Sequence, residues 1–166
     1  MIDISKISSL YKIRRLDDSD ADAVLELCLG NPQFYDYCEE EPTKEQVLFD
    51  LKETPAGKAA EDKYFIGFYQ NEALVAVMDL IDGYPNSSTA YIGFFMMNKS
   101  LQGQGLGSEI ITEIAERLKA LGFSVIRLAI NKGNPQSAHF WEKNGFKTIK
   151  EVERNGYILL VAERYL

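Results

Sequence analysis

The sequence predicts an α/β fold of the α+β kind, built on a mixed, twisted sheet of about six to seven strands. Three extended segments follow one another between residues 64 and 97 with short turns between them, which predicts an antiparallel N-terminal half of the sheet. A strand, an amphipathic helix and another strand then succeed each other between residues 90 and 130, an order typical of a right-handed crossover between parallel strands. The dipeptide Asn155-Gly156 between two further extended segments predicts a terminal hairpin.

The first third of the chain is expected to hold one short strand and two helices. Residues 17–20 supply N-cap chemistry for the first helix, and Gly30-Asn31-Pro32 ends it. Thr43 is the expected cap of the second helix. The expected ranges are a strand at 11–15, helices at 17–29 and 43–53, and an aromatic and acidic loop at 34–42.

The remaining elements follow from periodicity and from turn residues. Apolar residues recur at helical spacing from residue 103 to about residue 121. Asn134-Pro135 begins a further helix that reaches about Lys143. The segment 90–97 is almost continuously hydrophobic, which favours a central strand. The expected strands lie at 64–69, 74–81, 90–97, 125–130, 146–152 and 157–162.

The composition is typical of one globular domain, expected to span residues 1–166. Hydrophobic residues make up 46%, yet no segment approaches the roughly 18 apolar residues of a membrane span. Residues 1–15 lack the apolar core of a secretion signal, and Cys28 and Cys38 form neither a CxxC pair nor a metal cluster. We therefore expect a cytoplasmic protein without a metal or a membrane partner. The formal charge of −7 argues against a nucleic-acid partner and favours a cationic substrate.

The segment Gln102-Gly103-Gln104-Gly105-Leu106-Gly107 stands where a strand ends and a helix begins. Alternate glycines leave backbone N–H groups uncovered, and the positive end of the helix dipole points to the same place, which predicts a diphosphate site. A P-loop would need a Lys after the last glycine, and a dinucleotide fingerprint would need its third glycine in place of Ser108. A glycine-rich turn that only packs a helix closely onto the sheet is the alternative.

Two spaced motifs resemble those of the GCN5-related N-acetyltransferase (GNAT) superfamily. The segment 102–107 matches its cofactor motif Gln/Arg-x-x-Gly-x-Gly/Ala. A second family motif, Asn-x-x-Ala-x-x-Phe/Leu-Tyr-x-Lys-x-Gly-Phe, is matched beyond the next strand, with Ser137 in place of Ala and Trp141 in place of Tyr. The matching residues there are Asn134, Phe140, Lys143, Gly145 and Phe146. The resemblance implies parallel, splayed fourth and fifth strands, helices on both faces of the sheet, and acetyl-CoA as co-substrate.

In such enzymes the pantetheine arm lies between the splayed strands. The resemblance implies that the amide of Met97 polarises the thioester carbonyl, and that the amides of residues 103–108 bind the pyrophosphate. Asn134 would hydrogen-bond the pantetheine or thioester end, or would be an ordinary helix cap. The implied cofactor-binding residues are Phe95, Met96, Met97, Gln102, Gly103, Gln104, Gly105, Leu106, Gly107, Ser108, Asn134, Ser137, Phe140, Trp141 and Lys143.

The resemblance implies direct acetyl transfer to an amine, which must be neutral to attack and so needs a base or a water chain. Asp79, flanked by apolar residues, is the candidate base, although an Asp that points to solvent or anchors the sheet edge is equally compatible. Tyr91 occupies the register where some relatives carry a catalytic Glu. Because indole is a poor proton donor, Trp141 leaves protonation of the thiolate to Tyr91, Tyr84 or water, or is a packing choice. His139 is expected on a helix surface.

The acceptor side is less defined by the sequence. Phe34, Tyr35 and Glu39 lie between the first two helices, where relatives build the acceptor pocket, and are the candidate substrate-binding residues. A solvated acidic loop is the alternative. The implied function is N-acetylation of a small-molecule or protein amine by a monomer or homodimer. Other acyl-CoA or O-acyl transfer, and acyl-CoA sensing without catalysis, stay open.

Overall fold

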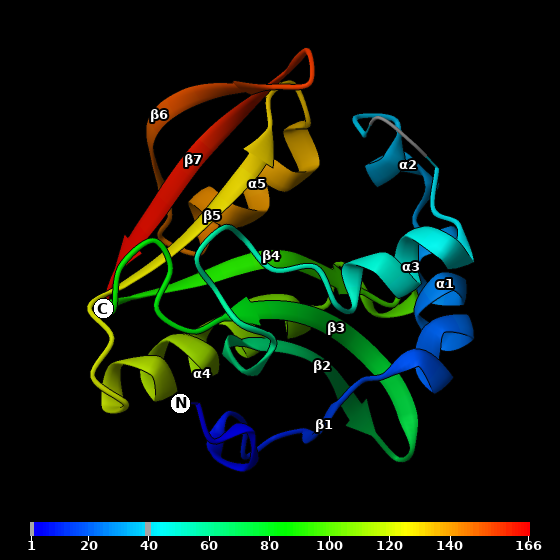
Figure 1. The fold of residues 1–166 in the computed structure, drawn as a ribbon. Coiled ribbons are helices and arrows are strands. Elements are labelled where there is room, and N and C mark those ends of the chain that lie inside the picture. Colours follow the sequence, from blue (N-terminus) through cyan, green and yellow to red (C-terminus); the bar gives the residue numbers. More distant parts are fainter. Residues whose placement is uncertain (1, 39–40) are drawn as a thin grey trace.

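The computed structural model describes residues 2–38 and 41–166. Within this part of the chain the strands form one mixed sheet in the order β1-β2-β3-β4-β5-β7-β6, with β4 at its centre (Figure 1). β4 and β5 are parallel, and the other neighbouring strands are antiparallel. The predicted sheet is thereby confirmed. The strands are β1 (Lys12–Arg15), β2 (Lys63–Gln70), β3 (Ala73–Ile81), β4 (Thr89–Met97), β5 (Val125–Asn131), β6 (Lys147–Arg154) and β7 (Tyr157–Tyr165).

Two of the expected helix caps are present. Thr43 Oγ1 accepts a hydrogen bond from Gln46 N–H at 3.1 Å, and Asn134 Oδ1 accepts one from Ser137 N–H at 3.0 Å. The helices are α1 (Ala21–Leu29), α2 (Pro32–Tyr35), α3 (Lys44–Asp50), α4 (Leu106–Ala120) and α5 (Pro135–Lys143). Short 3₁₀ turns lie at Ile4–Lys6, Asp18–Asp20, Ala60–Asp62 and Lys99–Leu101.

Three helix boundaries differ from the expectation. α4 begins at Leu106 because Gly103 and Gly105 have φ of +76° and +84°, left-handed values that a right-handed helix excludes. The segment Pro32–Tyr35, expected as part of a loop, forms one helical turn, since its proline stands at the first helical position where no N–H is needed. α3 ends early, at Asp50.

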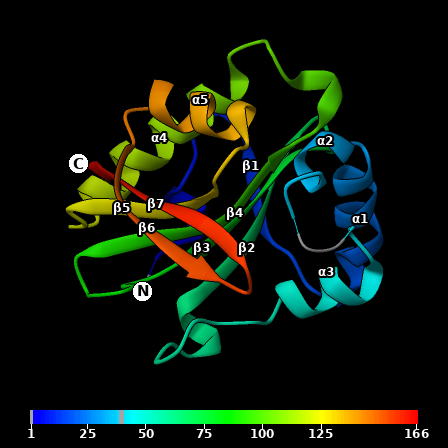
Figure 2. The same ribbon diagram turned by 90° about the horizontal axis from the view of Figure 1, so that it is seen from above.

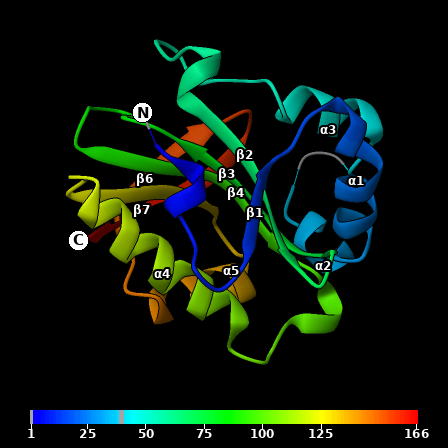
Figure 3. The same cartoon turned by 90° about the horizontal axis from the view of Figure 1, so that it is seen from below.

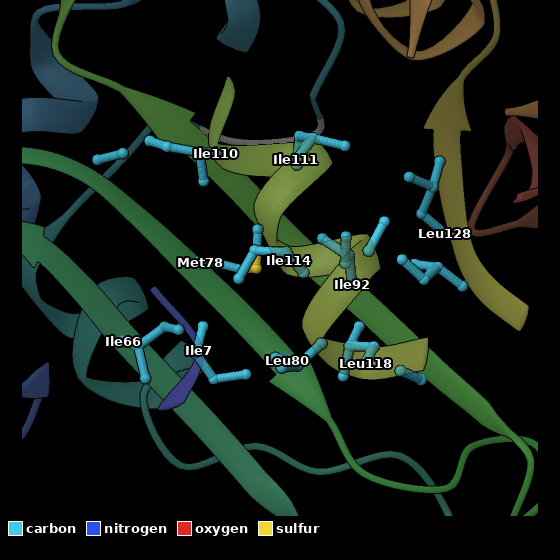
Figure 4. Packing of buried hydrophobic residues seen from close by; sticks show 14 of the residues in the cluster. Ile7, Ile66, Met78, Leu80, Ile92, Ile110, Ile111, Ile114, Leu118 and Leu128 are labelled. Carbon is cyan, nitrogen blue, oxygen red and sulfur yellow. The ribbon is translucent and has the colours of Figure 1, made fainter. Parts of the chain in front are cut away.

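An apolar stripe on α4 covers one face of the sheet. Its residues are spaced three or four apart and are almost completely buried, and burying one such side chain contributes about 1.5–3 kcal/mol. Figure 4 shows Ile110, Ile111, Ile114 and Leu118 against Ile66, Met78, Leu80, Ile92 and Leu128. Leu106 packs against the same cluster, so the stripe holds the N-terminus of α4 beside the sheet.

The opposite face of the sheet is covered by α1 and α3. Figures 2 and 3 show α1, α2 and α3 on one side of strands β1 to β4, and α4 and α5 on the other. The expected helices on both faces are therefore confirmed. The second apolar cluster contains Val24, Leu27 and Val47 of the helices with Phe65, Val77 and Met96 of the strands.

β4 and β5 pair over only the first part of their length. Residues 89–92 of β4 lie beside residues 125–128 of β5, and beyond this point the strands diverge (Figure 1). The register between β3 and β4 shifts between Asp79 and Leu80, which leaves Gly93 as an extra, bulged residue. A Cβ on Gly93 would lie 2.5 Å from Asp79 Oδ2, so a larger residue here would have to displace the Asp79 carboxylate. The expected splay is confirmed, and it opens a gap in the middle of the sheet.

Candidate active site

A cavity of about 310 Å³ lies where β4 and β5 part. It is bounded by the end of β4, the turn that follows, the start of α4, α5 and the start of α2. All the predicted cofactor-binding residues line it except Gln104 and Leu106. The side chain of Gln104 donates to Ser100 O at 3.1 Å, and Leu106 packs against the core. The structure thus brings together two motifs that lie about thirty residues apart.

The backbone at the end of β4 turns toward this cavity groups that β5 does not pair, and of these the Met97 carbonyl already accepts from the side chains of Asn31 and Gln102. Asn98 N–H donates to Val75 O at 2.8 Å, so alternate residues of β4 are bonded to β3. Phe95 and Met97 occupy the other register positions and turn their N–H and C=O groups toward the gap, where β5 no longer pairs with them. An extended group in the cavity can therefore pair with β4 as a further strand would.

The charge of the cavity is opposite to that of the protein. Lys99 and Lys143 line it, and none of its described lining residues carries a carboxylate. The whole chain has a formal charge of −7. A cationic cavity in an acidic protein favours an anionic ligand at this place.

The glycines of the turn serve two purposes. Gly103 and Gly105 adopt positive φ, and a Cβ at either position would meet no atom within 4 Å, so their backbone is open on the cavity side. Gly107 is different, because a Cβ there would lie 2.8 Å from Met97 Sδ and 3.1 Å from the Phe140 ring. The first two glycines shape an anion cradle at the N-terminus of α4, and the third permits close packing.

Aromatic rings form the apolar wall of the cavity. Phe95 stacks on Phe140 with centroids 5.9 Å apart and an interplanar angle of 22°. Trp141, which is 7% exposed, lies edge-on to Phe140 and Phe146 at 5.0 Å from each. Trp141 therefore fills a packing position in the wall. Asn134, also buried, caps α5.

Asp79 lies beside the buried Lys63 in an interior strand of the sheet, and its side chain is 14% exposed. Its Oδ2 lies 2.8 Å from Lys63 Nζ, and Lys63 is only 5% exposed. Within residues 2–38 and 41–166, the buried Oδ1 of Asp79 has no hydrogen-bond partner. Burial raises the pKa of Asp79 to about 6, and Lys63 partly opposes the rise. The alternatives of a solvent-facing or edge-anchoring Asp79 are wrong, because β3 is an interior strand and most of the side chain is covered.

Tyr91 lies close to Asp79, although neither is among the described residues that line the main cavity. The Tyr91 ring meets Tyr84 edge-on, with centroids 5.4 Å apart. Burial, followed by the neighbouring Tyr84, raises the pKa of Tyr91. Its phenol thus keeps its proton at neutral pH, which suits a proton donor and not a base.

The sequence matches the model described as the acetyltransferase (GNAT) family over residues 25–146, more than half of the chain. The chain belongs to the GNAT acetyltransferase family. Enzymes of this family use acetyl-CoA, and the cationic cavity with its open backbone N–H groups fits that co-substrate. Among curated proteins, no sequence matches this GNAT chain.

Solved structures share the GNAT fold at low sequence identity. An acetyltransferase from Thermus thermophilus aligns with a TM-score of 0.72 and 22% identity over 93% of this chain and 96% of that one. The paia N-acetyltransferase from Thermoplasma acidophilum, in complex with coenzyme A, aligns with a TM-score of 0.67 and 18% identity over 93% of this chain and 98% of that one. The ribosomal-protein-S18-alanine N-acetyltransferase from Escherichia coli aligns with a TM-score of 0.68 and 14% identity over 93% of this chain and 92% of that one. At these identities the likeness shows the fold alone.

The helices on the other face form a second wall of this GNAT site. Phe34 lines the main cavity and meets Phe94 edge-on at 5.9 Å. Tyr35 lines a smaller cavity of about 40 Å³ together with Asp50. Burial raises the pKa of both Tyr35 and Asp50. Glu39, the third predicted substrate residue, lies outside the described residues.

Several residues of the cavity were not predicted from the sequence. His139 is exposed on the surface of α5, as expected, and it also lines the cavity. The helical spacing that places Phe140 and Lys143 at the cavity offered a signal for it. Asn31, which the sequence suggested only as part of a helix end, is 5% exposed and joins the cavity through Gln102. No local pattern marks Asn31, because its partners are distant in the sequence. The other unpredicted lining residues are Gln33, Lys99, Leu101 and Gln136.

None of the helices in residues 2–38 and 41–166 has the length and apolar character needed to cross a bilayer. The same residues bring together no group of three His, Cys, Asp or Glu side chains that would hold a metal ion.

Proposed function

We propose that the protein is an acetyl-CoA-dependent N-acetyltransferase that transfers the acetyl group directly to a primary amine. The observation that carries this proposal is the pair of N–H groups of Phe95 and Met97, which neither β3 nor β5 pairs and which face a cavity that also holds the N-terminus of α4. Acetyl-CoA supplies the acetyl group as a thioester.

Each part of the cavity suits one part of the co-substrate. The open backbone at Gly103 and Gly105 would hold the pyrophosphate, with help from the dipole of α4. Lys99 and Lys143 would add charge attraction to the phosphates. The Phe95 and Trp141 wall would cover the pantetheine arm. Asn134, in addition to capping α5, would hydrogen-bond the thioester end of that arm.

The amides at the end of β4 would stabilise the charge that develops on the carbonyl oxygen. Met97 N–H is the donor that the family resemblance suggests, from its position at the end of β4. Phe95 N–H faces the same gap and is closer in register to Asp79, whose strand partner is Phe94. We assign oxyanion stabilisation to this pair of amides.

Asp79 would accept the proton from the attacking amine. With a pKa of about 6 its carboxylate is mostly ionised near neutral pH and still basic enough to take a proton. Its free Oδ1 offers an acceptor site. Since Asp79 does not line the main cavity, an ordered water would connect it to the amine. Tyr91, with Tyr84 beside it, would be the proton donor for the departing thiolate, and because it does not line the main cavity either, its proton would also pass through an ordered water.

A covalent acyl-enzyme is not part of this proposal. Cys28 and Cys38 are not among the described residues that line the main cavity. Burial raises the pKa of both thiols, which keeps them protonated and weakly nucleophilic.

The acceptor would enter from the side of α1, α2 and α3, past Phe34 and Tyr35. An E. coli protein of the same fold is named for acetylating the alanine of a ribosomal protein, so a protein amine is as suitable a candidate as a small amine. Asp50 in the smaller cavity would favour a cationic group on that acceptor.

Release of free thiol from acetyl-CoA across a panel of small amines and N-terminal peptides tests the function. We expect steady turnover with at least one primary amine and none with the matching alcohol. Turnover with alcohols alone would replace N-acetylation by O-acetylation. Tight binding without turnover on any acceptor would favour a sensor, and failure to bind acetyl-CoA would contradict the scheme.

A further inference from the structure

The Asn31 side chain joins three elements around the end of β4. Its Nδ2 donates to Leu27 O at 2.9 Å, at the end of α1, and to Met97 O at 3.1 Å, at the end of β4. Its Oδ1 accepts from Gln102 Nε2 at 2.6 Å, in the turn before α4. Asn31 is 5% exposed, so these protein groups take the place of water around its amide.

The orientation of this amide is determined by its partners. Reversing it would place Oδ1 against the carbonyl oxygens of Leu27 and Met97, which can only accept hydrogen bonds. The side chain at this position must therefore both donate twice and accept once. Asparagine does so, whereas an ionised aspartate cannot donate.

The last peptide of β4 is held from both sides as a result. Gln102 Nε2 also donates to Met97 O, at 3.2 Å, so two amides hold this carbonyl. On the other side, Asn98 N–H donates to Val75 O of β3. Without Asn31 and Gln102, the end of β4 would be bonded on the β3 side alone, because β5 has already turned away.

Asn31 also stands at the N-cap position of α2, yet its side chain makes no capping bond there. An asparagine at this position usually caps its own helix. Here the side chain is directed to Met97, while the backbone carbonyl of Asn31 accepts from Phe34 N–H at 3.1 Å. The turn that carries Phe34, on the acceptor wall, is thus connected to the strand that lines the cofactor gap.

We propose that Asn31 is a positioning residue for acetyl transfer. Its side chain holds the Met97 carbonyl in place, and with it the N–H of the same residue, which also faces the gap. Because its backbone carbonyl accepts from Phe34, Asn31 also determines the position of α2 relative to β4. The cofactor-binding strand and the acceptor wall are then held at one separation. This inference rests on the proposed function and adds a residue that the family motifs do not include.

The test compares Asn31→Asp and Asn31→Ala with a matched control, Asn86→Asp. The Asn86 side-chain oxygen only accepts, from Ser88 and Thr89, so aspartate can replace it there. At saturating acetyl-CoA and amine, we expect turnover of both Asn31 variants to fall by at least about tenfold, because displacements of about 1 Å reduce rates by up to about 100-fold. Acetyl-CoA affinity should stay within about threefold and the control within about twofold of the wild type.

A pH profile separates positioning from a loss of folding. Relative to the wild type at each pH, Asn31→Asp should regain turnover as the pH falls, since a protonated aspartate supplies one donor to Met97 O. Asn31→Ala should show no such recovery. Circular dichroism confirms that each variant is folded at each pH. Folded variants with turnover within about twofold of the wild type, or a loss confined to acetyl-CoA affinity, would overturn the proposal.

Hydrogen exchange provides a readout that does not depend on activity. We expect the Asn98 amide to exchange at least about tenfold faster in Asn31→Ala and to be unchanged in Asn86→Asp. Unchanged exchange in Asn31→Ala would contradict the role of Asn31. A wild type that turns over no amine would instead overturn the proposed function, so the two failures can be told apart.

Discussion

The two sides of the gap between β4 and β5 are built from different kinds of groups. On the α4 and α5 side, the proposed donor site consists of main-chain N–H groups of Phe95, Met97 and the 103–107 turn, with Lys99 and Lys143 beside them in the cavity lining. On the α1 to α3 side, the chemistry depends on buried side chains, above all the pair Asp79 and Lys63. A site made of main chain can recur in many sequences, whereas a site made of side chains can differ between close relatives.

The two sides also differ in charge. The main cavity contains cations without a carboxylate among its described lining residues, whereas the acceptor side holds Asp50 and Asp79, whose pKa values burial raises. An anionic donor and a cationic acceptor would then approach from opposite faces of the sheet. A variant that alters one side leaves the other as an internal reference.

The largest effect is expected from Gly105→Glu, which puts a negative charge into the open cradle. Acetyl-CoA affinity should fall by more than about 100-fold, since the added carboxylate would repel the phosphates and compete with them for the backbone N–H groups. Isothermal titration calorimetry measures the loss. Gly122→Glu is the matched control, because Gly122 also has a positive φ of +95° and space for a Cβ but follows the far end of α4. Equal binding by the two variants would rule out the cradle as the phosphate site.

The substitution Asp79→Asn changes a residue of the acceptor side and leaves the main cavity unaltered. We expect turnover to fall by about 100-fold with acetyl-CoA affinity unchanged, since the variant lacks the proposed base. Steady-state kinetics at saturating acetyl-CoA provides the measurement. Asp62→Asn serves as the control, because it removes a carboxylate whose ion pair with Lys58 lies near the surface. If both variants lost turnover equally, the loss would reflect stability and not proton transfer.

The pH dependence of kcat/KM provides a second test of Asp79 as the general base. Because Asp79 must be deprotonated to act as the base and its pKa is about 6, kcat/KM should rise with pH through that value. Below pH 5 the wild-type profile should be steeper by about tenfold per pH unit than the profile of Asp79→Asn. The acceptor amine adds a second rise at higher pH in both proteins. A wild-type profile without the lower inflection would contradict the role of Asp79.

The smallest effect is expected from Trp141→Phe. The ring packs against Phe140 and Phe146, and phenylalanine keeps an aromatic wall, so turnover should stay within about tenfold of the wild type. Thiol-release kinetics measures the turnover of the variant, and titration with acetyl-CoA measures its affinity. A loss of several hundredfold in turnover with affinity intact would show that the indole takes part in the chemistry.

The cofactor side was largely predictable from the sequence, because its determinants are local. Positive-φ glycines before an amphipathic helix, and the Asn134-Pro135 start of α5, are short-range signals. The order of strands around the crossover then placed these two segments on either side of the gap.

The acceptor side was predictable only in part, because its contacts join distant segments. The burial of Asp79 beside Lys63 depends on the register of β2 against β3 and on the bulge at Gly93. The bonds from Asn31 to Met97 span 66 positions, and no sequence spacing indicates them. α2 was missed because a single turn is too short to show helical periodicity.

Backbone amide shifts of the labelled protein during titration with acetyl-CoA test most directly whether main-chain groups bind the donor. We predict saturable shifts at Phe95, Met97 and residues 103–108, where main-chain groups face the cavity, and smaller changes on α1 and α3. Binding that shifts only residues of α1 and α3, or no saturable binding, would contradict this assignment.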